Sequence, residues 1–329
     1  MQSFHFPDPS FFDGAVILRH IGVISAEGPD AASFLHGQLS QDVSGQQPAE
    51  ARLAAFCSPK GRMLASFLIL KPQTESLQLL TDAGILPAVL KRLSMFVMRA
   101  KARLTDASGS LAVVGLCGDS ARQWLGDVAT ATTADWQVQS HGISGGQVVS
   151  LPEVLGARRW LWVGPSDQVH ALTSALPTLS LPNWQWLDVM SGVVRIEPAT
   201  VDQFVPQMVN FDVVGGVNFK KGCYPGQEIV ARSQYRGTIK RRTFLLHADV
   251  PMQAGQEVFS TSDPAQPAGL VVNAAAMPGP DGQPSGAFSA LVELKWQALN
   301  EGWNLASPQG PTLVLGTLPY EVPMGESNE

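Results

Sequence analysis

The chain has 329 residues, of which 45% are hydrophobic and 15% are charged, and its formal net charge is −6. This length and composition predict a folded protein with a large core and two or three domains, and they exclude an intrinsically disordered chain. The negative charge argues against a general nucleic-acid binder, and no apolar run reaches the ~18–20 residues of a membrane-spanning helix.

The cysteines and the N-terminal residues indicate a cytoplasmic protein. Cys57, Cys117 and Cys223 are odd in number and far apart, which favours a reducing compartment over a disulfide framework. Residues 1–14 lack the basic start and the continuous apolar stretch of a signal peptide. No C-x-x-C or H-x-x-H pair is present, so we expect no self-contained zinc site.

The first expected region, residues 1–110, mixes strands and helices. In chain order, the sequence predicts a strand at 15–28, a helix at 30–43, two strands at 52–70 joined by a turn at 58–61, a helix at 85–100, and a strand at 102–106. The second expected region, residues 111–242, continues with strands at 111–118, 147–152 and 158–164, and with helices at 119–126, 166–176 and 183–196. This order predicts an α+β body and not a doubly wound parallel sheet.

The third expected region, residues 243–329, has a different character. Short β-rich runs separated by Pro/Gly turns occur at 242–250, 256–261, 268–277, 286–296 and 311–319. This pattern predicts a small antiparallel β-barrel or sandwich. The charge changes sharply at the same boundary: residues 220–242 hold seven bases and one acid, whereas residues 243–329 hold nine acids and one base.

A lone cysteine lies in the basic stretch. Cys223 follows Lys220 and Lys221, and Gly222 and Gly226 predict a tight turn around it. A neighbouring cation favours the thiolate, which is a nucleophile, a metal ligand or a redox-sensing group. The alternative is that Cys223 packs as a small hydrophobic residue, which is what we expect of Cys57 and Cys117 because both lie in apolar strands. One thiolate cannot hold an iron–sulfur cluster alone, so any cluster role for Cys223 would be transient, or shared with a partner or another chain.

Aromatic and basic residues alternate just after the cysteine. Tyr224 and Tyr235 lie among Arg232 and Arg236, an arrangement that stacks on a heteroaromatic ring while the cations hold a carboxylate or phosphate. The alternative is a solvated basic loop.

Several segments of the sequence resemble a known protein family. The segment "KKGCYPGQE" resembles the K-G-C-[YF]-x-G-Q-E signature of the YgfZ family of folate-binding proteins. The segments "GPDAASFLHGQLSQDV" and "AAFCSPKGRMLASF" and the block from Gly192 to Arg242 resemble the same family. The resemblance implies a three-lobed fold like the T-protein of the glycine cleavage system, with folate in a central cavity and a C-terminal β-barrel. It also implies a link to iron–sulfur protein maintenance and tRNA modification.

The resemblance places some site residues and departs at others. Trp184 stands where relatives carry a folate-contacting tryptophan, although a core tryptophan is the alternative. Trp186 is two residues further on, so only one of the two is expected to face the cavity. Ile21 stands where some relatives have a second aromatic residue. Met190 replaces the glutamate of the T-proteins, and a thioether cannot shuttle a proton; Asp188 would need a different helical face to substitute.

The leading hypothesis is a folate-binding accessory protein that uses tetrahydrofolate or a derivative. Cys223, with Lys221 beside it, is predicted to act in maintaining iron–sulfur proteins or their assembly machinery, with an indirect effect on tRNA modification. The cofactor-binding residues are predicted to be Ile21, Trp184, Tyr224, Arg232, Tyr235 and Arg236. One rival is a tetrahydrofolate-dependent one-carbon transferase resembling the aminomethyltransferases. A second rival is a direct tRNA binder that uses the basic stretch.

Overall fold

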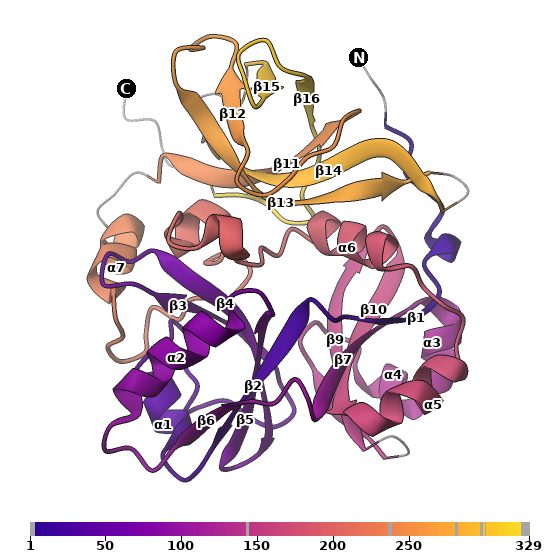
Figure 1. Cartoon of the computed structure of the whole chain (residues 1–329), viewed down its shortest axis with the longest axis vertical. Helices are drawn as coiled ribbons and strands as arrows, with labels where there is room; N and C mark the ends of the chain where they lie inside the picture. Colours follow the sequence, from indigo (N-terminus) through magenta and orange to yellow (C-terminus); the bar gives the residue numbers. More distant parts are fainter. Residues whose placement is uncertain are drawn as a thin grey trace.

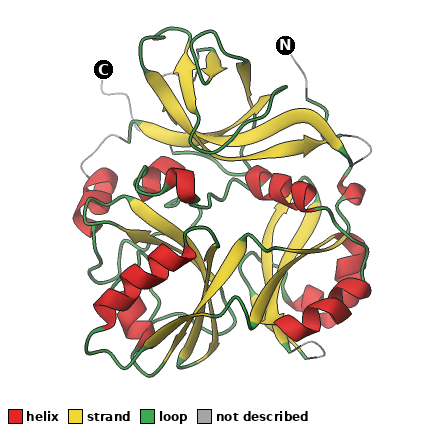
Figure 2. Ribbon diagram, in the orientation of Figure 1, coloured by secondary structure: helices red, strands yellow, loops and turns green. Residues whose placement is uncertain are grey.

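The computed structural model describes residues 4–142, 145–235, 239–279, 282–296, 299 and 301–323. The chain forms three lobes: two α+β lobes lie side by side, and a β-barrel lies across both of them (Figures 1 and 2). This arrangement confirms the predicted α+β body with a C-terminal barrel.

The first lobe is built on a five-stranded antiparallel sheet with the order β3-β4-β5-β2-β6. Helix α2 has a Pro in its first turn and buries Leu86, Val89 and Leu93, which fall on one helical face. The predicted hairpin is confirmed, with Gly61 at φ +73 in its turn. The elements are β2 (Ile21–Glu27), α1 (Ala31–His36), β3 (Arg52–Cys57), β4 (Met63–Gln73), β5 (Ser76–Asp82), α2 (Leu86–Val97) and β6 (Arg103–Asp106).

The second lobe has a five-stranded antiparallel sheet with the order β1-β7-β10-β9-β8. Its apolar face packs on short helices, which bury residues such as Ala121 and Leu125. The elements are β1 (Gly14–Ile17), β7 (Leu111–Cys117), α3 (Gly118–Leu125), α4 (Asp127–Ala131), β8 (Val138–His141), β9 (Gly146–Val154), β10 (Ala157–Pro165) and α5 (Val169–Ser174).

The strand expected at residues 15–28 is in fact two strands in two different sheets. The chain turns after β1, where the Ile21 amide donates to the Leu18 carbonyl at 3.0 Å. Strand β1 then pairs with β7 in the second lobe, whereas β2 pairs with β5 and β6 in the first. The expected region 1–110 therefore contributes strand β1 to the second lobe. The sheet that β1 joins is determined by long-range pairing with β7 and not by the local sequence pattern.

Helix α6 (Leu181–Met190) connects the lower lobes to the barrel. Ser180 caps it by accepting a hydrogen bond from the Asn183 amide. The helix lies under the barrel strand β13 (Pro267–Pro278; Figure 1). The helix was expected to continue to residue 196, but it ends before Gly192, which has φ +72. In the part of the chain that the structure describes, the other helical elements are α7 (Gln227–Tyr235) and the short 3-10 helices η1 (Pro9–Phe11), η2 (Ser166–Gln168), η3 (Pro198–Thr200) and η4 (Pro206–Val209).

The third lobe is a closed antiparallel barrel with the order β11-β14-β13-β12-β15-β16. Its core is formed by alternate inward side chains, such as Phe244, Leu246, Val292 and Leu294. The strands are β11 (Arg241–Ala248), β12 (Glu257–Ser260), β13 (Pro267–Pro278), β14 (Pro284–Lys295), β15 (Trp303–Leu305) and β16 (Thr312–Leu315). Among the residues placed in the structure, no helix is long and apolar enough to cross a bilayer.

A buried carboxylate in the barrel makes the stability depend on pH. Burial raises the pKa of Glu293 to about 7, although Arg241 donates to both of its oxygens at 2.7 and 3.0 Å. The folded state thus keeps this proton to a higher pH than the unfolded state does. Its contribution to the free energy of unfolding is fully present below about pH 4.3, the range in which an unfolded Glu titrates, and is lost as pH rises through 7.

Buried His20 and His247, whose pKa values are lowered to about 4, make stability rise with pH in the same range, so the effect of Glu293 has to be isolated by a variant. We expect the melting temperature of the wild type to fall relative to that of the Glu293→Gln variant, which has no proton to lose at this position, between pH 5 and pH 8. Differential scanning calorimetry at the two pH values measures both. Equal pH dependence in the two proteins would show that Glu293 does not carry the effect.

Candidate functional site

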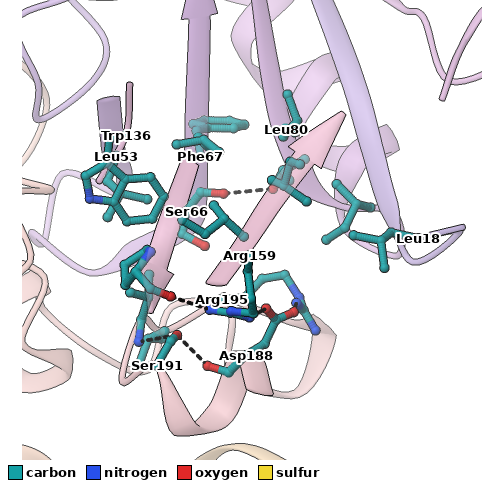
Figure 3. Close-up of a pocket in the computed structure, with 18 of the residues that line it drawn as sticks. Leu18, Leu53, Ser66, Phe67, Leu80, Trp136, Arg159, Asp188, Ser191 and Arg195 are labelled. Atoms are coloured by element: carbon teal, nitrogen blue, oxygen red, sulfur yellow. Dashed lines mark hydrogen bonds and ion pairs between the residues drawn. The ribbon is translucent and has the colours of Figure 1, made fainter. Parts of the chain in front are cut away.

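A cavity lies where the two lower lobes meet the C-terminal half of α6 (Figure 3). It holds about 730 Å³ of space between the lining atoms, with its open mouth included. Side chains from both sheets and from the segment after α6 surround it. Its lining consists of Leu18, Ile21, Leu53, Ser66, Phe67, Leu68, Leu80, Thr81, Trp136, Leu151, Pro152, Arg159, Leu161, Trp184, Asp188, Ser191, Val193, Val194 and Arg195.

One tryptophan of α6 forms part of the cavity wall, and the other does not. Trp184 is fully buried and lines the cavity, and the Arg159 guanidinium lies 5.3 Å from its ring centroid. Gly115 of β7 leaves the space that this ring needs, because a Cβ there would lie 2.6 Å from it. Trp186 points to the barrel, where its Nε1 donates to Ser289 Oγ at 2.9 Å. The expectation that only one of the two faces the cavity is confirmed.

The polar part of the cavity is an ion-pair cluster. Asp188 lies one helical turn after Trp184, so the two share a face of α6. Its Oδ1 accepts from Arg159 Nη1 at 2.8 Å, and its Oδ2 lies 3.6 Å from Arg195 Nη1. Figure 3 shows these three charged side chains gathered on one side of the apolar residues. Arg159 is almost fully buried, so this pairing compensates a charge that water does not reach.

Asp188 and Met190 lie on different faces of α6, as their spacing of two residues led us to expect. The face that meets the cavity is that of Asp188. The structure places the Asp188 carboxylate in the cavity lining, whereas Met190 is buried and is not part of it. The spacing of four residues from Trp184 was the signal in the sequence that could have found this.

Several N–H donors around the cavity have no hydrogen-bond acceptor. Among the described atoms, Trp184 Nε1 and Arg159 Nε are buried without a hydrogen-bond acceptor, whereas Arg195 Nε lies 3.7 Å from Asp82 Oδ2 in an ion pair. An unpaired buried donor costs about 1–3 kcal/mol, so a ligand that supplies acceptors would gain from filling this site. The cavity therefore suits a flat, mostly apolar molecule with acceptor atoms on one edge and N–H groups for Asp188.

A histidine next to the cluster is kept neutral. Burial, followed by the nearby Arg195 charge, lowers the pKa of His20 to about 4. Neither of its ring nitrogens has a hydrogen-bond partner among the described atoms. His20, Arg159 and Arg195 were not among the predicted site residues. The available signal for Arg159 was the pair Arg158 and Arg159 at the start of β10, directly before an apolar run.

The cysteine loop lies away from this cavity. Cys223 is exposed, and the Lys221 ammonium donates to the carbonyls of His36, Leu39 and Gly222 at 2.6, 3.1 and 3.1 Å. Burial lowers the pKa of Lys221 to about 8, while Asp42 and Cys223 oppose this shift. The lysine thus fastens the loop to the end of α1 in addition to placing a charge near the thiol.

The predicted site residues therefore separate into two groups. Ile21 and Trp184 line the cavity, whereas Lys221, Cys223, Tyr224 and Arg232 do not. Tyr224 is buried, its ring lies 4.8 Å from Lys221 Nζ, and burial raises its pKa. Arg232 is exposed on α7. Tyr235 is the last residue of α7. Its side chain and the whole of Arg236 lie outside the part of the chain that the structure describes.

Two arginines of the basic stretch at residues 220–242 form ion pairs within the protein. Arg241 pairs with Glu293 at 2.7 Å, and the buried Arg242 pairs with Asp212 at 2.7 Å. These two arginines support the barrel instead of adding to a free basic face. Across the described residues, no group of three or more His, Cys, Asp and Glu side chains is arranged to hold a metal ion.

The three thiols are expected to differ in reactivity. Burial raises the pKa of both Cys57 and Cys117 to about 12, and both side chains are inaccessible, as predicted from their apolar strands. Titration of the native protein with Ellman's reagent should therefore modify one thiol, Cys223, and denaturation should release two more. Modification of two or three thiols at the same rate in the native state would contradict this assignment.

Comparison with known proteins identifies the family. Residues 14–154 match the GCVT N-terminal domain. The chain is 32% identical over 260 residues to the tRNA-modifying protein YgfZ of Photorhabdus laumondii, with 77% of each chain covered. It is 31% identical over 240 residues to that of Colwellia psychrerythraea, with 71% of each covered. The chain belongs to the YgfZ family.

This YgfZ family member shares its fold with a protein outside the family. The chain superimposes on the glycine cleavage system aminomethyltransferase T of Bartonella henselae with a TM-score of 0.74, covering 97% of this chain and 90% of that one. The identity between the two is 15%, so this likeness concerns the fold. It confirms the expected T-protein-like architecture.

Proposed function

We propose that this protein binds a reduced folate in the cavity beside Trp184 and acts as an accessory factor for iron–sulfur proteins. The observation that carries the proposal is the cavity itself, which combines apolar walls, the Asp188 carboxylate and unpaired N–H donors. The names of the relatives indicate a setting in tRNA modification. In this proposal the effect on tRNA passes through iron–sulfur enzymes that modify it.

The residues present fit a pterin ring. Trp184, Ile21 and the surrounding leucines supply an apolar slot, and Asp188 offers acceptor oxygens to the N–H groups of a pterin edge. The free donors of Trp184 and Arg159 suit its carbonyl and ring nitrogens. A bound tetrahydrofolate would supply a carrier for one-carbon units. The neutral His20 adds no charge that would compete for Asp188.

Cys223 has a separate part in this proposal. Its exposed thiol, on a loop that Lys221 fastens to α1, is accessible to a second protein. One thiolate does not hold a cluster alone, so Cys223 would act on or with the partner. In cells that lack this protein, the Cys223→Ala variant should fail to restore iron–sulfur enzyme activity. Restoration to the wild-type level would exclude the thiol role.

The one-carbon transferase is a second candidate function, and one observation favours it. That function needs a carboxylate facing the ligand, and Asp188 faces the cavity. Both Asp188 oxygens are engaged by arginines, which opposes a role in moving protons. Release of formaldehyde or of methylene-tetrahydrofolate from aminomethyl donors by the purified protein would establish this function in place of the accessory role.

A direct tRNA binder finds less support. Two of the seven bases at residues 220–242 are neutralised by Glu293 and Asp212. A binder that used the stretch would lose about one log unit of affinity per log unit of salt for each phosphate contacted. Fluorescence anisotropy with bulk tRNA at two salt concentrations measures this slope, and we expect no specific binding.

Calorimetric titration with 5-formyltetrahydrofolate tests the folate site. We expect one site per chain, and we expect Trp184→Leu to weaken binding about tenfold or more, because an aromatic wall in a desolvated pocket contributes strongly to affinity. Trp186→Leu is the matched control, since that equally buried ring faces the barrel. Equal loss in both variants, or no binding to the wild type, would refute the site.

A further inference from the structure

The end of α2 carries a cluster of exposed apolar side chains. In the described part of the chain, eight large hydrophobic side chains are exposed, and three of them lie within four positions. Met95 is 63% exposed, Phe96 is 44% exposed and Met98 is 88% exposed. Helix α2 packs on strands β6 and β2 of the first lobe and buries Leu86, Val89 and Leu93 there (Figure 1). The side chains of Met95, Phe96 and Met98 remain outside the core that the helix completes.

The same segment is strongly basic. Residues 83–105 contain five bases and no acid, although the whole chain has a net charge of −6. All five bases are exposed, and none has an ion-pair partner among the described residues. Asp30 lies at the edge of the segment, where it accepts a hydrogen bond from the Lys101 amide at 2.7 Å. The bases are Lys91, Arg92, Arg99, Lys101 and Arg103.

The backbone conformation of Met98, the residue that follows α2, is energetically unfavourable. Met98 has φ 34 and ψ −89, in the region that favours glycine and costs other residues about 1–3 kcal/mol. Its side chain is almost fully exposed, so packing contributes little to offset this conformational energy. Packing in the isolated chain therefore does not account for a methionine at this position.

We propose that the α2 tip, defined as Met95, Phe96 and Met98 with the five surrounding bases, docks an acidic surface patch of a partner protein. The apolar side chains would enter a shallow hollow of the partner, and the bases would pair with carboxylates around it. This inference rests on the proposed accessory function for the kind of partner, a folded client protein. It adds a docking surface that is separate from the folate cavity and from Cys223.

The observations favour a protein over RNA or an anionic membrane. The chain has a net charge of −6, which opposes general binding to extended polyanions such as RNA or an anionic membrane. The α2 tip has a single aromatic ring, whereas single-strand binders stack successive bases on several. Methionine, in contrast, adapts to irregular protein surfaces.

Site-specific photo-crosslinking in living cells tests the proposal. A photoreactive amino acid at position 95 should give a discrete protein adduct, and mass spectrometry should place the crosslink beside Asp or Glu residues of the identified partner. The paired substitution Lys91→Glu and Arg99→Glu should reduce the adduct about tenfold or more. The same photoreactive residue at Leu315, which is 45% exposed in the barrel, is the matched control and should give no such adduct.

Other outcomes would overturn the docking surface. They are no adduct at position 95, an adduct that survives charge reversal, or an adduct of RNA. Binding of the purified protein to bulk tRNA or to 1:1 phosphatidylglycerol–phosphatidylcholine vesicles that is lost on charge reversal would also overturn it. The titration with 5-formyltetrahydrofolate separates the two proposals. A charge-sensitive adduct with no folate binding would support the docking surface and refute the folate function.

Discussion

Replacing Asp212 with alanine is expected to lower the free energy of unfolding by about 3–5 kcal/mol, because it leaves a buried guanidinium without its partner. Arg242 is 2% exposed and donates to both Asp212 oxygens at 2.7 and 3.1 Å and to the Gln207 carbonyl at 2.9 Å. This pair fastens the first barrel strand to the η4 segment. Urea unfolding followed by circular dichroism measures the loss.

Two further variants isolate the cause of this loss. Asp119→Ala removes the partner of Arg122 from an exposed pair and should change the free energy of unfolding by less than about 0.5 kcal/mol. Asp212→Ala combined with Arg242→Met removes the uncompensated charge and should recover most of the stability. If Asp212→Ala behaves like Asp119→Ala, the buried pair does not stabilise the junction.

Replacing Gly115 with alanine should both destabilise the protein and impair the cavity. The added Cβ would lie 2.6–2.7 Å from three ring atoms of Trp184, so the ring has to move, and the available space is the cavity. Overpacking of this kind costs about 1–3 kcal/mol. We also expect weaker binding of 5-formyltetrahydrofolate, measured by calorimetry on the folded variant.

A matched glycine gives the control for this substitution. A Cβ at Gly109 meets no atom within 4 Å, so Gly109→Ala should leave both stability and folate binding near the wild-type values. Full folate binding by Gly115→Ala would show that the position of the Trp184 ring does not matter to the ligand.

Local pattern predicted much of this fold. Alternating apolar residues between Pro/Gly turns predicted the barrel, and the Ser58–Gly61 turn predicted the hairpin of the first lobe. The buried state of Cys57 and Cys117 followed from their apolar strands. The split between β1 and β2 did not follow, because pairing with β7 depends on residues about 100 positions away.

The candidate site was harder to predict because it is assembled from three distant segments. Sequence adjacency grouped Cys223 with aromatic and basic residues. Of those that the structure describes, Lys221 anchors the loop, Arg232 is exposed on α7, and Arg241 and Arg242 form ion pairs at the barrel. The lining of the cavity comes from β2 to β5, from β9 and β10, and from α6 and the segment after it. Arg159 illustrates the difficulty, since its partner Asp188 lies 29 positions further along the chain.

A crystal structure of the protein with 5-formyltetrahydrofolate tests the central claim most directly. We predict that the pterin ring lies in the cavity against Trp184 and Ile21, with its N–H edge at the Asp188 carboxylate. A cavity that stays empty at saturating ligand, or a folate bound at another surface of the protein, would contradict the account.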